Sequence, residues 1–190
     1  MGRCNKEGRG VVVPTITIFN ENETVDYGGM QEYLDFLLEN HVDALFAMGT
    51  TQENATFGAD EYKELVRFMV EYVDGKVPVY IGVSSPATRI RLEIRSVHRT
   101  FQSLIVGADG WTAGIGNVFP EKCRKIWDTV VEKKDYEEGF KLWKEVLPFL
   151  NMTINKDFYG KSGRADWLQM YKLGLNLRLG LSAKVRRPLF

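Results

Sequence analysis

Two adjacent threonines, Thr50 and Thr51, follow a short apolar run and a glycine in the stretch Ala-Leu-Phe-Ala-Met-Gly-Thr-Thr. The run predicts a buried strand, and a helical pattern begins soon after the threonines. Small anionic ligands of α/β folds bind at the carboxyl ends of such strands. Adjacent threonines offer side-chain and main-chain donors to one carboxylate. The spacing therefore indicates a site for a small anion.

The elements around this motif alternate between strand and helix. Strands are expected over residues 11–18, 42–48, 77–83 and 110–115. Apolar residues at helical spacing predict one helix after Asp26, which suits an N-cap, and another that opens at Asp60 and ends at Asp74-Gly75. Strands that alternate with helices predict a parallel sheet with right-handed crossovers.

The second half of the chain is expected to be mainly helical. One helix starts at Pro120, which suits a first turn, and runs to about Lys133. A helix over 135–149 is expected to pack through Phe140, Trp143, Leu147 and Leu150. Residues 151–164 read as a loop and 167–177 as a last helix. Residues 84–104 are basic and predict a helix whose arginines face solvent, with a phosphate-binding patch as the alternative.

Composition excludes several classes of function. Lys and Arg number 25, as do Asp and Glu, which argues against a nucleic-acid or membrane surface built on net charge. No apolar run reaches the length of a membrane span. Two cysteines, no metal-ligand spacing and no nucleotide-binding motif predict neither a metal nor another cofactor. Without an apolar signal segment, the chain is expected to be cytoplasmic.

Several segments resemble the dihydrodipicolinate synthase / N-acetylneuraminate lyase family, in the family's order. Residues 49–53, Gly-Thr-Thr-Gln-Glu, resemble its signature Gly-Thr-Thr-Gly-Glu, with Gln52 in place of a glycine. Val13-Pro14-Thr15 resembles the opening strand and Gly75 to Gly82 the third strand. Residues 107–120 resemble the eighth strand and the helix after it, and Val185 to Leu189 the C-terminal close.

The resemblance implies a (β/α)₈ barrel with C-terminal helices, and class I aldolase or lyase chemistry. Members form a Schiff base between a lysine and pyruvate or another 2-oxo acid, without a cofactor. On this pattern Thr50 belongs to the catalytic hydroxyl relay, Thr51 holds the substrate carboxylate, and Thr112 touches the 2-oxo acid. The resemblance also implies a homo-oligomer.

The chain is shorter than the fold requires. A (β/α)₈ barrel takes about 250 residues, and this chain has 190. The family's strands four to seven, with the reactive lysine and its tyrosine, are missing between 85 and 107. We therefore expect an incomplete barrel over 1–134, with an internal deletion between 85 and 107, and a helical extension over 135–190. None of the lysines considered as substitutes, Lys76, Lys122, Lys125 and Lys161, ends a predicted strand.

Two functional hypotheses remain open. The chain is a lyase-family protein that acts by descent on a 2-oxo acid but lacks the Schiff-base lysine, and so is inactive alone. Alternatively, it is a non-catalytic binding or assembly protein that pairs with a full-length homologue through open sheet edges.

Overall fold

A four-stranded parallel sheet lies at the centre of the protein. The structure, a computed structural model, describes residues 9–82, 100–154 and 166–186. The strands are β1 (Gly10–Pro14), β2 (Ala44–Ala47), β3 (Val79–Ile81) and β4 (Gly110–Thr112). Their order across the sheet is β3-β2-β1-β4, and all neighbours are parallel. The four predicted strands and their parallel arrangement are confirmed.

The register places the carboxyl ends of the strands along one edge. Val12 of β1 pairs with Ala44 of β2 on one side and with Thr112 of β4 on the other. Strand β1 is buried throughout, as expected for a strand flanked by two others. It ends at Pro14, earlier than the predicted Ile18, because a proline has no N–H to continue the ladder.

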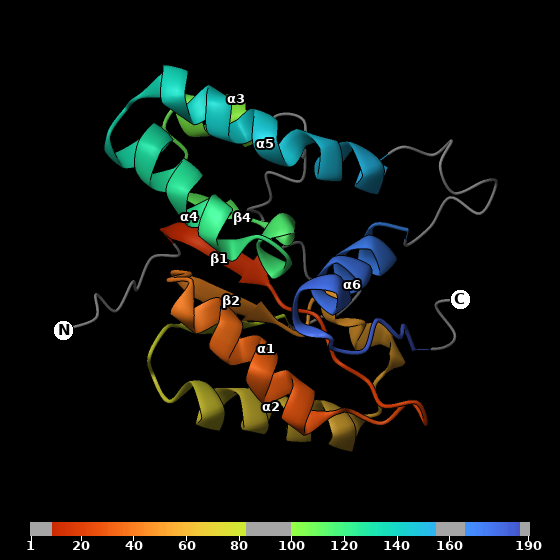
Figure 1. The fold of residues 1–190 in the computed structure, drawn as a ribbon. Coiled ribbons are helices and arrows are strands. Elements are labelled where there is room, and N and C mark those ends of the chain that lie inside the picture. The colour runs from red at the N-terminus through yellow and green to blue at the C-terminus, as the bar shows by residue number, and fades with distance from the viewer. Residues whose placement is uncertain (1–8, 83–99, 155–165, 187–190) are drawn as a thin grey trace.

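Two helices connect the first three strands. Helix α1 (Tyr27–Glu39) begins at the predicted cap, since the Asp26 carboxylate accepts a hydrogen bond from the backbone N–H of Gly29 at 3.0 Å. Helix α2 (Ala59–Val73) begins one residue before the predicted start at Asp60, with Gly58 in the N-cap position. It ends at Asp74, whose left-handed backbone is followed by a positive φ at Gly75, as predicted. Figure 1 shows both helices on the same side of the sheet.

The described helices of the second half surround β4 and the carboxyl edge. They are α3 (Thr100–Ile105), η4 (Gly114–Asn117), α4 (Pro120–Trp127), the π-helical turn η5 (Asp128–Glu132), α5 (Tyr136–Ile154) and α6 (Asp166–Leu179). Figure 1 shows α6 beside the end of the sheet toward which the strand arrows point. The basic segment over 84–104 lies outside the described residues up to 99. The predicted loop over 151–164 starts later, because α5 continues to Ile154.

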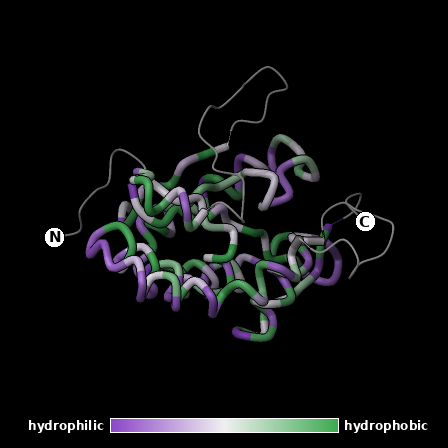
Figure 2. The backbone as a smooth tube through the Cα atoms, turned by 90° about the horizontal axis from the view of Figure 1, so that it is seen from above, coloured by the Kyte–Doolittle hydropathy of each residue, from purple (hydrophilic) through white to green (hydrophobic). Residues whose placement is uncertain are grey.

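One hydrophobic core joins the sheet to helices from both halves of the chain. Trp111, Trp127 and Trp143 are buried in it, and for Trp143 this confirms the predicted packing role. Figure 2 shows hydrophobic and hydrophilic residues alternating along the helical coils, the pattern of helices that bury one face. The predicted packing face of α5 needs one correction: Phe140 is 49% exposed, and Leu142 and Val146 are buried instead. Phe140 reaches the core only at its border, where its ring meets that of Phe101.

An ion pair closes the amino edge of the sheet. The Asp43 carboxylate accepts a hydrogen bond from the backbone N–H of Val11 at 2.7 Å and pairs with Arg124 of α4. Gly10 permits this approach: its φ is +104°, and a Cβ there would lie 2.2 Å from the Asp43 carboxylate. This edge lies opposite the predicted site.

Candidate functional site at the carboxyl edge of the sheet

The three threonines singled out from the sequence lie at the carboxyl edge. Thr50 and Thr51 follow β2 after Met48 and Gly49, and Thr112 is the last residue of β4. Strand β1 separates β2 from β4, so the two strand ends are about 10 Å apart, twice the strand spacing. Thr50 and Thr112 are exposed and Thr51 is half-buried. Within the described part of the chain, none of the three hydroxyls has a hydrogen-bond partner.

Two non-glycine residues with left-handed backbones bracket the threonine pair. Met48 has a φ of 55° and Glu53 a φ of 61°, a conformation that residues with a side chain seldom adopt. Both are buried. Such backbones persist only where the surroundings over-determine them, and they concentrate at functional sites. We call residues 48–53 the threonine loop.

Gln52 fixes the loop from inside. Its side chain is fully buried, and its Oε1 accepts hydrogen bonds from the backbone N–H of Met48 at 2.6 Å and from the Thr15 hydroxyl at 2.9 Å. The Thr17 hydroxyl donates to the backbone carbonyl of Gln52 at 3.0 Å. Thr15 and Thr17 follow β1, so the segment after one strand holds the loop after its neighbour. Gln52 lies in the 3₁₀ turn η1 (Thr50–Gln52), where a residue with a side chain fits without strain.

Glu53 fixes the loop from the C-terminal side. Its side chain and that of Lys172 in α6 are both 0% exposed, and Oε1 of Glu53 forms an ion pair with Nζ of Lys172. Oε2 of Glu53 accepts a hydrogen bond from the backbone N–H of Arg186 at 2.8 Å. Burial raises the pKa of Glu53, although Lys172 partly offsets this, and burial lowers the pKa of Lys172.

The guanidinium of Arg186 fastens the same segment to the N-terminal half. It pairs with the Glu61 carboxylate of α2, with an Nη1 to Oε2 distance of 2.7 Å, and its Nε donates to the Glu23 carbonyl at 2.9 Å. It lies 4.5 Å from the ring centroid of Phe19, and the Lys172 ammonium lies 4.6 Å from that centroid. Cations over an aromatic face are stabilised by its negative potential. Two carboxylates and two cations thus balance in one cluster.

A second buried contact holds the segment after β4. The Tyr33 hydroxyl of α1 donates to Oδ1 of Asn117, and Nδ2 of Asn117 donates to the carbonyls of Pro14 at 3.0 Å and Gly114 at 2.7 Å. The ends of β1 and β4 are therefore joined through one amide side chain. Burial raises the pKa of Tyr33.

No described lysine is placed to attack a substrate at this edge. Lys76 follows α2 and precedes β3, at the amino edge, and Lys122 and Lys125 lie on α4. Lys161 lies outside the described residues. Lys172, which the sequence reasoning did not consider, is near the edge, but it is fully buried and held by Glu53. A nucleophilic lysine needs a lowered pKa and access to the substrate, and Lys172 has only the first.

The threonine loop could be located from the sequence, but the residues that contact Glu53 could not. Lys172 and Arg186 lie more than 100 positions away from Glu53 along the chain, and no local pattern links them to it. A lysine on the buried face of α6 is the one available signal, since a lysine is almost never fully buried without a partner. Within the described ranges, no group of three or more His, Cys, Asp or Glu side chains is arranged to hold a metal ion.

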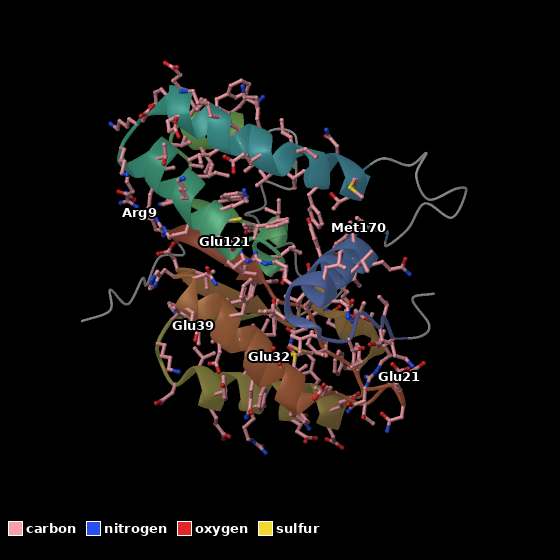
Figure 3. All side chains as sticks on the ribbon, in the orientation of Figure 1. Arg9, Glu21, Glu32, Glu39, Glu121 and Met170 are labelled. Atoms are coloured by element: carbon pink, nitrogen blue, oxygen red, sulfur yellow. The ribbon has the colours of Figure 1, made fainter. Side chains whose placement is uncertain are left out.

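A groove of about 480 Å³ lies elsewhere, along α1 and α2. Glu32, Asp35, Glu39 and Tyr72 contribute to its lining, and Figure 3 labels Glu32 and Glu39 on α1. None of the three threonines lines it, so it is not part of the site. No helix among the described residues has the length and apolar character needed to cross a membrane.

Comparison with known proteins agrees with this geometry. The sequence pattern of the Dihydrodipicolinate synthetase family matches residues 7–96. A 4-hydroxy-tetrahydrodipicolinate synthase of Phocaeicola vulgatus is 38% identical over 85 residues, which are 45% of this chain and 29% of that protein. The enzyme of the same name from Staphylococcus carnosus is 35% identical over 100 residues, 53% of this chain and 32% of that protein. The matched segments therefore span about a third of these relatives.

Solved structures share the fold at lower identity. Dihydrodipicolinate synthase of Bacteroides thetaiotaomicron has a TM-score of 0.79 at 15% identity, with 97% of this chain and 93% of that chain covered. YagE of Escherichia coli K12, a member of the same family in complex with pyruvate, has a TM-score of 0.77 at 17% identity, with coverage of 95% and 92%. Residues 7–96 therefore match the Dihydrodipicolinate synthetase family in sequence, and the incomplete (β/α)₈ barrel of the described residues shares the fold of solved dihydrodipicolinate synthases.

Proposed function

We propose that the chain binds pyruvate or another small 2-oxo acid in the cytoplasm, at the carboxyl edge of its sheet. Thr51 anchors the carboxylate, Thr112 contacts the keto acid from β4, and Thr50 belongs to the hydroxyl relay. The observation that carries the proposal is the shared edge: the ends of β2 and β4 present threonine hydroxyls that no described residue engages. A rigid loop with free donors suits an anion better than a mobile one, because little entropy is lost on binding.

We further propose that the isolated chain forms no Schiff base. Lys172 is the described lysine nearest the loop through Glu53, and it is locked in a buried ion pair. The described residues therefore include the half of a lyase site that holds the substrate and no lysine placed to attack it. We therefore expect a chain that descends from lyases or aldolases but does not turn over substrate by itself.

Saturation-transfer NMR with pyruvate tests the binding site. We expect weak binding to the wild type that is lost in Thr51→Val and reduced in Thr112→Val. Thr24→Val, which changes an exposed threonine of the turn before α1, is the matched control and should bind like the wild type. Equal binding by all four proteins would exclude the carboxyl edge as the site.

Reduction with borohydride in the presence of pyruvate tests the nucleophile. Mass spectrometry is expected to show no lysine carrying the reduced adduct. An adduct on any lysine would overturn the proposed inactivity and identify the nucleophile.

A second candidate function is assembly through the edges of the sheet. Among the residues that the structure describes, β3 pairs only with β2 and β4 only with β1, and a parallel sheet of four strands does not close into a barrel. Open edges pair readily with other strands. Light scattering and a pull-down against a full-length homologue test this function, and a stable monomer that captures no homologue would refute it.

A further inference from the structure

We propose that Lys172 and Arg186 are positioning residues for the threonine loop and that they act through Glu53. The inference deepens the proposed 2-oxo-acid site and, for its effect on binding, rests on it. The structural part of the inference does not rest on the proposed function, because it concerns the contacts that hold the threonine loop when no ligand is bound.

The C-terminal end of the threonine loop is fixed by residues outside the loop. Gln52 secures the inside of the loop through Thr15 and Met48. Glu53 comes next, with its left-handed backbone, and nothing in its own turn fixes its side chain. Both carboxylate oxygens are instead directed at the C-terminal part of the chain, one toward Lys172 and one toward the N–H of Arg186.

Lys172 also neutralises the charge of the buried Glu53 carboxylate. A buried carboxylate next to an anion site repels the anion unless a cation neutralises it. The Lys172 ammonium supplies that cation in direct contact with Oε1 of Glu53. Without Lys172 the carboxylate would be a buried, uncompensated charge, and the loop would have to open to let water reach it.

The segment that carries Arg186 is itself anchored at several points. Its guanidinium is bound to Glu61 and to the carbonyl of Glu23. Lys184 of the same segment pairs with Glu21, 3.7 Å away, in the turn before α1, and Figure 3 labels Glu21 close to this segment. The Arg186 N–H is therefore presented to Glu53 from a fixed backbone.

The geometry excludes a direct catalytic role for Glu53. Its side chain is 0% exposed and both oxygens have partners on the protein. A general acid or base must come within hydrogen-bond reach of the substrate, and Glu53 has no free oxygen to offer. The threonines between Met48 and Glu53 are the groups left facing outward.

Amide hydrogen exchange on the full chain tests the hold directly. The N–H groups of Gln52, Glu53 and Asn54 donate to Gly49 or Thr50 carbonyls within the loop and report its opening. Lys172→Met is expected to speed their exchange about 100-fold, the effect of stranding one charge of a buried pair, while amides of β1 and β2 change less. Arg186→Met retains the backbone N–H and is expected to give about a tenfold increase.

Two further variants make the test specific. Glu53→Gln/Lys172→Met removes both charges and keeps an acceptor for the Arg186 N–H, so slow exchange should return; it also covers the case in which Lys172→Met does not fold. Arg124→Met is the control, because it breaks an ion pair at the opposite edge of the sheet. It should affect stability without selective opening of the loop.

The outcomes separate this inference from the proposed function. Unchanged loop exchange in Lys172→Met, or a change no larger than in Arg124→Met, overturns the positioning role even if the wild type binds pyruvate. Selective loop opening with no pyruvate binding by the wild type supports the positioning role and refutes the ligand. If pyruvate binds, its affinity should fall in Lys172→Met and recover in the double variant.

Discussion

The hydroxyl of Thr15 donates a hydrogen bond to Oε1 of Gln52 over 2.9 Å, and neither side chain is exposed. This contact joins the segment after β1 to the loop after β2. It also explains how a glutamine occupies a position where the family signature has glycine. The left-handed residues of the loop are Met48 and Glu53, so the position of Gln52 does not require a glycine. The Gln52 side chain can therefore serve as an internal brace.

Replacing Gln52 with leucine should destabilise the protein. The substitution leaves the buried N–H of Met48 without its acceptor, while the Thr15 hydroxyl keeps only the Phe46 carbonyl, 3.2 Å away. The expected cost is about 1–3 kcal/mol in the free energy of unfolding. Urea denaturation measures the change. Gln31→Leu, at an exposed position of α1, is the control and should shift the free energy by less than about 0.5 kcal/mol. Equal effects at both positions would contradict the bracing role.

Tyr33→Phe tests the contact that joins β1 and β4. Loss of the hydroxyl leaves Oδ1 of Asn117 buried without its donor, and we expect the free energy of unfolding to fall by about 1–3 kcal/mol. Tyr136→Phe removes a hydroxyl from a tyrosine that is 43% exposed and should be nearly neutral. Thermal unfolding of both variants against the wild type decides between them, and a neutral Tyr33→Phe would count against the contact.

Asp26→Ala should weaken the start of α1. The Asp26 carboxylate is the acceptor for the N–H of Gly29, and loss of such a cap costs about 1 kcal/mol. Asp60→Ala changes an acidic residue in the first turn of α2 that is not its cap, so a smaller loss is expected. The midpoints of urea denaturation compare the two, and a larger loss for Asp60→Ala would refute the assignment of the caps.

The buried pair of Glu53 and Lys172 predicts a dependence of stability on pH. Burial raises the pKa of Glu53 in the folded protein above the ordinary value of 4.5. As the pH rises from that value, the unfolded chain loses its proton before the folded protein does, and the folded protein therefore loses stability. Burial lowers the pKa of Lys172 below 10.5, so stability is also lost as the pH falls from that value. Both effects lower stability near neutral pH.

Glu53→Gln/Lys172→Met removes both titrations and leaves Arg186 and Glu61 in place. Near pH 7 we expect the double variant to be as stable as the wild type or more stable by up to about 4 kcal/mol. The difference should shrink toward acid and toward alkaline pH. Unfolding free energies across the pH range measure it, and a constant difference would show that the pair does not titrate with folding.

Local patterns predicted most of the fold. Alternating strand and helix signals placed the sheet, and the Asp26 cap and the Asp74-Gly75 stop were visible because helix ends depend on nearby residues. Strand lengths were overestimated, because apolar residues such as Ile16 and Ile18 are buried after β1 ends. Burial alone does not distinguish a strand from a buried connecting segment.

The site was predicted only in part. Thr50, Thr51 and Thr112 were expected at one edge, and the structure places them there; their roles in binding and in the relay stay predictions. The groups that hold the loop were not predicted, since the contacts of Glu53 with Lys172 and Arg186 depend on tertiary folding. The domain boundary after residue 134 and the deletion between 85 and 107 also stay predictions, and sequencing the transcript across this region tests the deletion.

Glu53 and Arg186 are 133 positions apart in the sequence. At a ribosomal rate of about 5–20 residues per second, roughly 7 to 27 s separate the synthesis of the loop from that of the residue that completes its hold. During that interval the nascent chain contains Thr50 and Thr51 but does not yet contain Arg186, whose backbone N–H binds Glu53. Completion of the site is therefore coupled to completion of the polypeptide, and a prematurely terminated product that ends before Arg186 would be made without it.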